Sequence, residues 1–331
     1  MKQGATPDIR PGEAVASPLT GGMAEHAHSL DSSAVIDRYA EIGLDVRASL
    51  SPFSRLDIFR CCDTGYRFFH PQSLAGEADF YEQLQHISAR AVGEEHEYRD
   101  WSDDFQYVFD RIVPGERLLD VGCGNGAFLR RAAEKAEVMG IDGSRFAQRH
   151  CQRLGLDVRL GRIADFSDGF ADRFDTVCAF QLLEHIYDVR SFLADVVKVV
   201  RPGGRLIIAV PNNEPFMRRF DPYSPLNCPP HHVGLWNRES LEKSAPYFGL
   251  VPSTHHYCEV SGRWAVEAYL HARYLLGIKS EIHSHSLLQK LMMLSLAPYT
   301  VPLSLWRAWR TRGRGTRNVI VMVFEKAAGR A

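Results

Sequence analysis

Near the middle of the chain, residues 118–126 read LLDVGCGNG. The apolar run before the glycines, Arg117–Val121, is typical of a buried strand, and residues 127–135 behind them are typical of a helix. The glycines stand at alternate positions and leave out side chains where a ligand would touch the backbone. Free N–H groups at the start of the helix would attract a carboxylate or a phosphate. The segment therefore predicts a strand, a ligand-binding turn and a helix.

Strand-like and helical stretches alternate on both sides of this segment. Further strands are expected at 138–141, 158–160, 176–180, 205–210, 252–258 and 318–325. Helices are expected at 144–154, which a serine opens and Gly155 closes, and at 189–200. The Pro-Gly order of residues 201–204 is typical of a tight turn. This alternation predicts an α/β fold of the Rossmann-like, doubly wound type, with a mostly parallel seven-stranded sheet and ligands at the carboxyl ends of its strands.

The sequence divides into five segments around this pattern. Residues 1–30 are rich in Gly, Pro, Ala and Ser and are expected to be a disordered leader. Residues 31–112 are expected to form a helical N-terminal lid on the substrate side, although 57–69 is strand-like. Residues 113–261 are the expected ligand-binding core, and 262–317 a helical insert. Residues 318–331 would add the last strand of the core and a tail.

Two acidic residues flank the glycines. Asp142 follows Gly122 by twenty residues, at the end of the next strand, where an acid can accept both hydroxyls of a ribose. The glycines alone also fit a relaxed dinucleotide fingerprint, so a dehydrogenase is a competing class. Asp120 argues against it, because an acid two residues before the first glycine would repel a pyrophosphate and attract a cation.

Together with GID at 140–142, FDTVCAFQLLEHI at 174–186 and RPGGRLIIAVPN at 201–212, the glycine segment resembles class I S-adenosylmethionine-dependent methyltransferases. The resemblance covers about residues 101–250 and implies S-adenosylmethionine as the cofactor. It implies that Asp120 holds the methionine amino group and that Asp142 holds the ribose. The remaining cofactor-binding positions that it implies are Gly122, Cys123 and Gly124 in the turn, Gly143 and Ile163 beside the adenine, and Gln181 at the methionine end.

One position departs from the family's pattern. The third strand of such enzymes is usually followed by Gly-Asp, whereas this chain has Gly161-Arg162. The family often uses that acid on the adenine amino group. Asp165 or a backbone carbonyl would have to take its place here.

Candidate catalytic residues lie after the fourth and fifth predicted strands. Glu184 and His185 follow the fourth, and His231 and His232 lie in a proline-rich loop after the fifth. Methylation of an alcohol requires removal of its proton, for which a histidine suits neutral pH. A histidine at such a position more often caps a turn or satisfies a core hydrogen bond, and both interpretations stay open for each of the three.

No metal site is expected. The Gln181…Glu184-His185 pattern resembles ubiquinone-type O-methyltransferases, in which an acid at the first position helps to bind a divalent metal. Glutamine at position 181 removes that hard, charged ligand, which leaves at most a weak site at Glu184 and His185. The adjacent Cys61 and Cys62 lack the second spaced pair that tetrahedral zinc needs.

Charge and hydropathy restrict the partners and the location. A net charge of -1 gives no general attraction to nucleic acid, and we expect no nucleic-acid partner. Seven cysteines without framework spacing indicate reduced thiols and a cytoplasmic protein. Residues 291–306 are apolar but shorter than a membrane span, and 307–317 hold five arginines and no acid. Two interpretations of 291–317 remain: an insert packed on the domain, or peripheral contact with the inner face of a membrane.

The sequence thus predicts an S-adenosylmethionine-dependent methyltransferase that acts on a hydroxyl of a small molecule. A sugar or glycan-type acceptor is the first expectation, on account of a resemblance of residues 60–82 to the leaders of bacterial methyltransferases encoded beside glycan-building enzymes. The alternative acceptor is a quinone or lipid-like phenol at a membrane surface. A catalytically silent relative that acts as a binding protein is a third hypothesis, although the glycine turn and Asp142 are intact. The sequence leaves the oligomeric state open.

Overall fold

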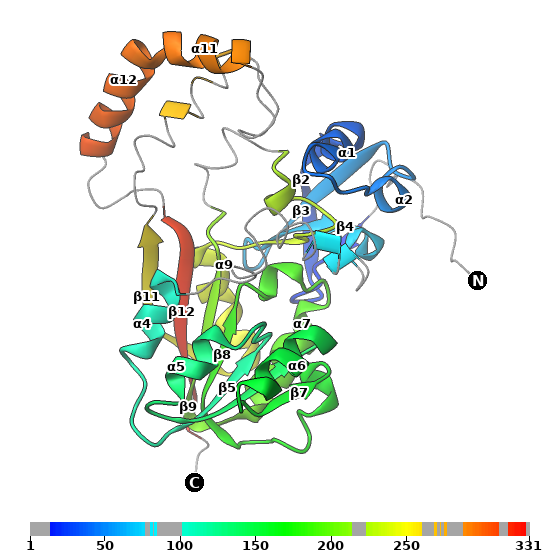
Figure 1. Ribbon diagram of the computed structural model, residues 1–331. Helices are drawn as coiled ribbons and strands as arrows, with labels where there is room; N and C mark the ends of the chain where they lie inside the picture. Colours follow the sequence, from blue (N-terminus) through cyan, green and yellow to red (C-terminus); the bar gives the residue numbers. More distant parts are fainter. Residues whose placement is uncertain are drawn as a thin grey trace.

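The computed structural model describes residues 14–76, 80–81, 83–84, 101–213, 223–259, 268–269, 272, 275–276, 287–310 and 317–328 (Figure 1). Within them, a seven-stranded sheet has the order β11-β12-β9-β8-β5-β6-β7. Its strands are β5 (Arg117–Val121), β6 (Glu137–Asp142), β7 (Val158–Leu160), β8 (Phe174–Phe180), β9 (Val200–Pro211), β11 (Leu250–Glu259) and β12 (Arg317–Lys326). Strands β5 to β9 pair in parallel, and β12 is antiparallel to both of its neighbours. The expected α/β fold with a mostly parallel seven-stranded sheet is confirmed.

Helices cover both faces of this sheet because neighbouring residues of each strand point to opposite sides. The helices are α4 (Asp103–Phe109), α5 (Ala127–Ala132), α6 (Arg145–Arg153), α7 (Val189–Val199) and α9 (Arg238–Ser244). Leu119 lies in one core cluster with residues of α7 and α9, whereas Leu118 lies in a second cluster with residues of α4, α5 and α6. The side chain of Ser144 accepts a hydrogen bond from the Ala147 N–H at 3.3 Å and caps α6, as its sequence predicts.

The strand order reverses between β5 and β8. From β5 the chain adds β6 and then β7 on one side, and it returns to place β8 and β9 on the other. In open sheets of this kind the crevice outside the carboxyl ends of the two strands at the reversal is the usual ligand site. The residues that follow β5, β6 and β8 are the predicted glycine turn, Gly143 and Gln181.

The N-terminal part is built on a sheet, and this corrects two expectations. Strands β1 (Val15–Ala16), β2 (Met23–Asp31), β3 (Arg55–Cys61), β4 (Arg67–His70) and β10 (Gly234–Leu235) form a five-stranded antiparallel sheet. The expected leader of residues 1–30 is therefore ordered from β1 onward, and its first thirteen residues lie outside the described residues. Most of β2 is exposed, so its sequence lacks the apolar alternation of a strand, and pairing with β3 defines it instead.

Among the described residues of the N-terminal segment, helices are a smaller part than expected. Helix α1 (Ser32–Glu41) and the short α2 (Arg47–Leu50) accompany the sheet, with one-turn helices η1 (Gln72–Leu74) and, later in the chain, η5 (Pro225–Asn227). Residues 78–89, a part of the expected helical lid, fall largely outside the described residues. Strand β10 comes from the loop after the core strand β9, so this loop completes the N-terminal sheet.

Residues 201–204 are part of β9 and do not form the expected separate turn. Phe174 of β8 pairs with Val200 of β9, and Thr176 pairs with Arg205. Between these two pairs, β8 advances by two residues and β9 by five. The extra residues form a bulge in which Gly203 adopts a φ of +70°. The Pro-Gly residues therefore lie in a bulge of β9 and not in a turn between two elements.

The expected helical insert precedes the last strand as α11 (Leu287–Ser295) and α12 (Ala297–Arg310). Both helices stand away from the two sheets at the upper end of Figure 1. Among the described residues no helix has the length and apolar content required to cross a membrane.

Candidate active site

The glycine turn bends sharply after β5. Gly122, Gly124 and Gly126 have φ of +78°, +54° and +74°, which side-chain-bearing residues rarely adopt. The Gly122 N–H donates to the Ile141 carbonyl at 2.7 Å, so the turn is fixed to the end of β6. A Cβ on Gly122 would lie 2.9 Å from Cδ2 of Leu182, so only glycine fits there without displacing that side chain. The turn therefore joins the ends of β5, β6 and β8.

The carboxylate of Asp142 holds this turn from the end of β6. Its Oδ2 accepts the Gly124 N–H at 2.9 Å, and its Oδ1 accepts the Ser144 N–H at 2.8 Å. A carboxylate oxygen has two acceptor sites, so each oxygen retains one for a ribose hydroxyl. A Cβ on the neighbouring Gly143 would meet no atom within 4 Å, which leaves room for a flat ring beside it. Burial raises the pKa of Asp142, and the two backbone hydrogen bonds oppose that rise.

Asp120, at the end of β5, is a buried acid without sufficient partners. Its side chain is 2% exposed, and its Oδ1 has no hydrogen-bond partner among the described residues. Burial, and then the charge of Asp142, raise the pKa of Asp120 well above its ordinary value. A cationic group beside this oxygen would favour the ionised form.

Gln181, directly after β8, carries a buried hydrogen-bond donor, whereas Asp120 carries a buried acceptor. Its backbone φ is +50°, an uncommon value for a residue with a side chain, and its N–H donates to the Ala209 carbonyl at 2.8 Å. Its Nε2 is buried and has no hydrogen-bond partner among the described residues. An amino-acid zwitterion has an ammonium group that can donate to Oδ1 of Asp120 and a carboxylate that can accept from Nε2 of Gln181. These two residues therefore fit the methionine end of S-adenosylmethionine.

The two remaining predicted cofactor residues contribute walls rather than polar side chains. Cys123 is 8% exposed, and its Sγ lies 2.6 Å from where a Cβ on Gly140 would stand, so it packs against β6. Ile163 begins the one-turn helix η3 (Ile163–Asp165) and is 3% exposed in the core. Oδ2 of Asp165 already accepts the Arg162 N–H at 2.7 Å, which limits it as a replacement for the missing adenine acid.

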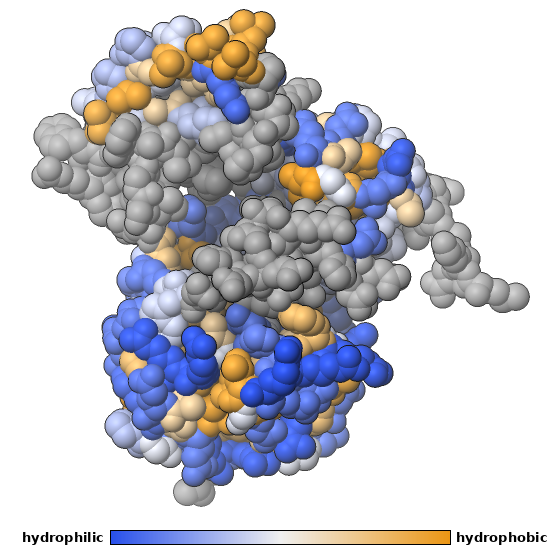
Figure 2. All heavy atoms as spheres, in the orientation of Figure 1, coloured by the Kyte–Doolittle hydropathy of each residue, from blue (hydrophilic) through white to orange (hydrophobic). Residues whose placement is uncertain are grey.

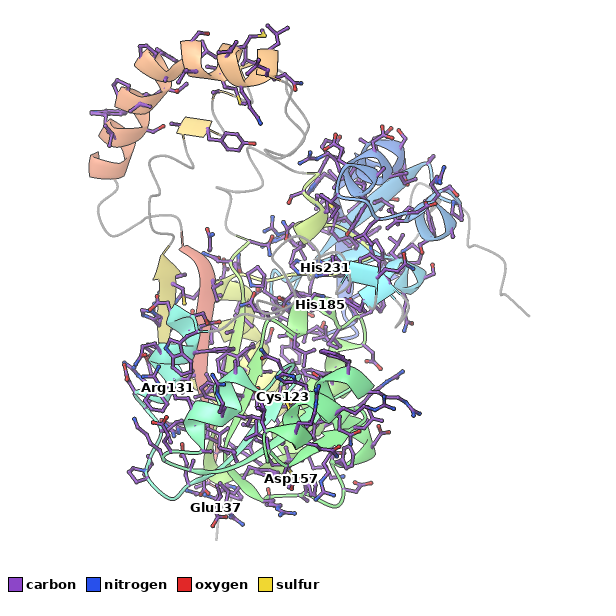
Figure 3. The ribbon with its side chains drawn as sticks, viewed as in Figure 1. Cys123, Arg131, Glu137, Asp157, His185 and His231 are labelled. Carbon is purple, nitrogen blue, oxygen red and sulfur yellow. The ribbon has the colours of Figure 1, made fainter. Side chains whose placement is uncertain are left out.

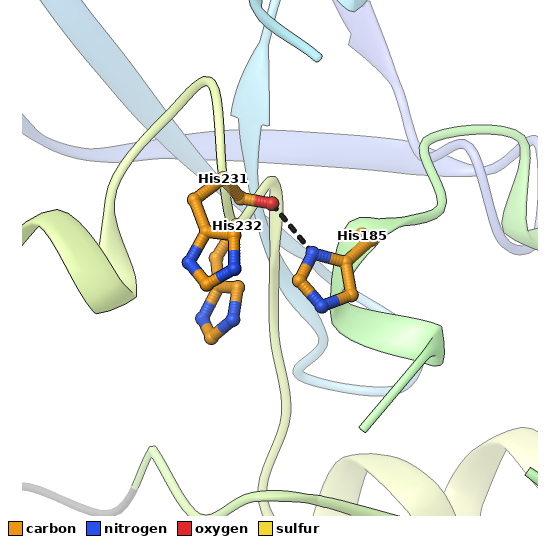
Figure 4. Close-up of side chains that lie close together, drawn as sticks. All are labelled: His185, His231 and His232. Carbon is orange, nitrogen blue, oxygen red and sulfur yellow. Dashed lines mark hydrogen bonds between the residues drawn. The ribbon is translucent and has the colours of Figure 1, made fainter. Parts of the chain in front are cut away.

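The four predicted catalytic residues come together from two distant segments. Glu184 and His185 lie in the one-turn helix η4 (Leu183–His185) after β8, and His231 and His232 lie in the loop that leads to β10. The Val233 N–H donates to the Glu184 carbonyl at 2.9 Å and fixes the loop to η4. The ring centroid of His185 lies 4.7 Å from that of His231 and 4.8 Å from that of His232 (Figure 4). Figure 3 shows His185 and His231 above Cys123, with Glu137 at the start of β6 toward the opposite end.

A hydrogen bond assigns the tautomer of His185. Its Nδ1 lies 2.7 Å from the His231 carbonyl oxygen, which can only accept. The proton of the neutral ring therefore resides on Nδ1, and Nε2 carries the lone pair. Oε1 of Glu184 lies 3.9 Å from Nε2 of His185 and 3.9 Å from Nε2 of His232, so one buried carboxyl group faces both rings.

Burial keeps all three imidazoles uncharged near neutral pH. It is the main cause that lowers the pKa of His185, against which hydrogen bonds to the His231 and Gln181 carbonyls act. It lowers the pKa of His231 to about 3, with a further contribution from His185. It also lowers the pKa of His232 well below the ordinary value, together with the two neighbouring rings. Neutral rings can accept a proton or, in principle, ligate a transition metal, and one nitrogen of each lies within 4.8 Å of the others.

Tyr81 is a residue of this cluster for which the sequence predicted no role. Its hydroxyl donates to the His231 carbonyl at 3.1 Å and lies 3.3 Å from Nδ1 of His185. Burial raises its pKa above the ordinary value, so the hydroxyl stays protonated. No local sequence signal marks a tyrosine that reaches a loop 150 residues away.

Comparisons with known proteins show the family of this chain. A family described as "Methyltransferase domain" matches residues 94–253. The ubiquinone biosynthesis O-methyltransferase of Pseudomonas entomophila is 32% identical over 176 residues, which are 46% of this chain and 76% of that protein. The protein of that name from Alkalilimnicola ehrlichii is 35% identical over 110 residues, 31% of this chain and 44% of that protein. The chain belongs to the class I S-adenosylmethionine-dependent methyltransferases.

The extent of these matches is limited. The chain spans less than half the length of several of the relatives, 44%, 46% and 45% in three of them. Among solved structures, a Burkholderia thailandensis 1,6-didemethyltoxoflavin-N1-methyltransferase with bound S-adenosylhomocysteine is similar at a TM-score of 0.47 and 14% identity. That likeness covers 81% of this chain and 98% of the other.

Proposed function

We propose that this protein transfers a methyl group from S-adenosylmethionine to a hydroxyl group of a small molecule. The observation that carries the proposal is the pair of buried polar atoms beside the glycine turn, Oδ1 of Asp120 and Nε2 of Gln181, which have no hydrogen-bond partner among the described residues. When bound, S-adenosylmethionine supplies a methyl group on a positively charged sulfur that leaves with the electron pair of the broken bond. Asp120 and Gln181 would bind the amino-acid end, and Asp142 the ribose.

His185 is the proposed general base. As the acceptor oxygen bonds to the methyl carbon, the hydroxyl proton moves to Nε2 of His185, whose Nδ1–H the His231 carbonyl holds in place. Glu184 would stabilise the imidazolium that forms, and it faces His232 in the same way. His231 and His232 would complete the wall around the acceptor. We expect this proton transfer to proceed without a metal ion.

The acceptor is proposed to be a sugar or glycan-type hydroxyl. A quinone or lipid-like phenol is the second candidate, and the relatives support it because they are named ubiquinone biosynthesis O-methyltransferases. The two classes differ in acidity, since a phenol ionises near pH ~10 and an aliphatic alcohol far above that. A sugar hydroxyl therefore depends more strongly on a base. We propose that the protein acts in the cytoplasm and that it has no nucleic-acid partner.

The donor half of the proposal is tested by calorimetry. S-adenosylhomocysteine and NAD are titrated separately into the full chain, and we expect binding of the first alone. Asp142→Asn should weaken S-adenosylhomocysteine binding about tenfold or more, because an amide keeps only one of the two oxygens that anchor the turn and the ribose. Asp157→Asn, on the exposed opposite end of the core, is the matched control. Binding of NAD in place of the nucleoside would reject the proposed donor.

The acceptor half is tested with His185→Ala. For an alcohol acceptor, turnover should fall about 10²–10⁴-fold while S-adenosylhomocysteine affinity stays unchanged, because the ring acts only on the acceptor proton. Because burial lowers the pKa of His185, wild-type turnover should decline on the acid side only below pH ~6.5. His255→Ala on β11 is the control, and a chelator should leave the rate unchanged. A wild-type rate in His185→Ala, or a chelator-sensitive rate, would contradict the metal-free base mechanism.

A further inference from the structure

The C-terminal part of the insert, from residue 282 onward, combines positive charge with an absence of acids. Residues 282–324 contain no Asp or Glu, although the whole chain has slightly more acids than bases. The cations of this stretch are Lys290, Arg307, Arg310, Arg312, Arg314 and Arg317. Most of them follow directly on the apolar part of α12, so a positively charged segment adjoins an apolar one.

Helix α11 exposes its leucines. Leu287, Leu291 and Leu294 are 75%, 54% and 68% exposed, and their spacing places them on one face of the helix. No residue of α11 is buried. A helix of this composition on a water-soluble domain normally buries such a face.

The burial pattern of helix α12 is the reverse of that of a helix on the surface of a water-soluble protein. Its small polar residues Thr300 and Ser304 are 2% and 1% exposed, whereas Tyr299 and Trp306 are 60% and 49% exposed. Thr300 satisfies its hydroxyl by donating to the Leu296 carbonyl at 3.1 Å. Figure 2 shows the resulting apolar surface, which extends along α11 and α12 at the end of the molecule. We refer to the exposed residues of α11 and α12 as the insert face.

We propose that the insert face lies in the plane of an anionic membrane, with its apolar side chains among the acyl chains, and that the arginines of the adjoining sequence add attraction to the anionic headgroups. An interfacial helix needs one apolar face and flanking cations, and this segment has both. In the part of the chain that the structure describes, no helix is long and apolar enough to cross the membrane. Charge complementarity favours lipid over a second copy of the chain, because pairing two copies through this segment would bring together the twelve cations of two 282–324 stretches, which contain no acid.

The position of the face relates it to the proposed function, on which this step rests. In Figure 3 the insert lies beyond His185 and His231, on the side away from Glu137 at the start of β6. The carboxyl ends of the strands, where the acceptor is proposed to bind, therefore face the membrane. An acceptor hydroxyl carried on a lipid, whether of a glycan or of a phenol, would approach from that side.

Vesicle flotation of the full chain tests the proposal. The protein should float with vesicles that contain phosphatidylglycerol and much less with phosphatidylcholine alone, and added salt should reduce binding. Changing Leu287, Leu291 and Leu294 to serine should abolish flotation, since each change weakens partitioning about tenfold. Changing Arg312 and Arg314 to glutamine should weaken binding to anionic vesicles only. Leu154→Ser and Val251→Ser, at exposed apolar residues of the core, are the matched controls.

The outcomes separate this proposal from its alternatives. Unchanged flotation of the leucine variant, or equal binding to both kinds of vesicle, would overturn it. So would a wild-type dimer in solution that the leucine variant dissociates while neither floats. The leucine variant should retain wild-type S-adenosylhomocysteine binding, which also shows that it is folded. Failure of the wild type to bind that nucleoside would reject the proposed function and leave the flotation result standing.

Discussion

Asp120 places a carboxylate where folding alone would favour an apolar or fully paired residue. The group is buried, one of its oxygens has no hydrogen-bond partner among the described residues, and Asp142 adds a second negative charge nearby. Such an arrangement lowers stability without ligand. A bound cation would offset that cost, so ligand binding and stability oppose one another at this residue.

Asp120→Asn should therefore stabilise the ligand-free protein by about 1–3 kcal/mol at pH 7 while weakening S-adenosylhomocysteine binding. Because the pKa of Asp120 is raised by folding, the folded state holds the proton more tightly, and its stability falls as pH rises above ~4. The advantage of the variant should therefore grow from pH 4 to pH 7, as measured by urea unfolding.

Asp175→Asn is the control with the opposite sign. Asp175 accepts the Arg117 N–H at 2.8 Å and Nε of Arg201 at 2.5 Å, and its pKa is lowered in spite of partial burial. Removing its charge should destabilise the protein. A less stable Asp120→Asn variant with unchanged nucleoside affinity would show that Asp120 is structural.

At the scale of elements, η4 and the loop before β10 hold three neutral imidazoles against one another. Folding lowers their pKa values, so the unfolded chain binds more protons in acid. The free energy of unfolding should therefore decrease as pH falls below ~6.5, by up to about 1.4 kcal/mol per pH unit for each titrating ring. For His231 this loss should end near its folded pKa of about 3.

His231→Gln should reduce this slope between pH 6.5 and pH 4, because one proton-binding group is removed from the unfolded chain. Urea unfolding of the wild type and the variant at matched pH values measures the difference. Identical slopes would mean that the ring of His231 is not buried in the neutral form.

Local sequence signals predicted the core elements well. The bounds of β5 and β7 match the apolar runs that predicted them, and Ser144 caps α6 as expected. Prediction failed where partners far along the chain decide the structure. Strand β2 depends on pairing with β3, and residues 201–204 join β9 because β8 pairs on both sides of the bulge. Likewise, the histidine motifs were visible in the sequence, whereas the contact of Tyr81 with them was not.

At the scale of the whole molecule, the two sheets share one loop. The chain leaves the core after β9, carries His231 and His232, and then pairs with β4 as β10 before α9 returns it to the core. Trp236 directly follows β10, and its ring stacks on that of Tyr66, directly before β4, with the two centroids 4.0 Å apart. Both side chains are fully buried. The N-terminal sheet thus supports the segment on which the proposed base depends.

The pairing of β10 with β4 has a consequence for how such an enzyme can change its substrate. A hybrid that joined this core to a foreign N-terminal half would lose the register Gly234–Phe68 and Leu235–Arg67. The loop ahead of β10 would then shift, and with it the carbonyl that orients the ring of His185. Binding of S-adenosylmethionine by the core would survive such an exchange, whereas proton removal by His185 would not. The N-terminal half and the core are therefore expected to change together in evolution.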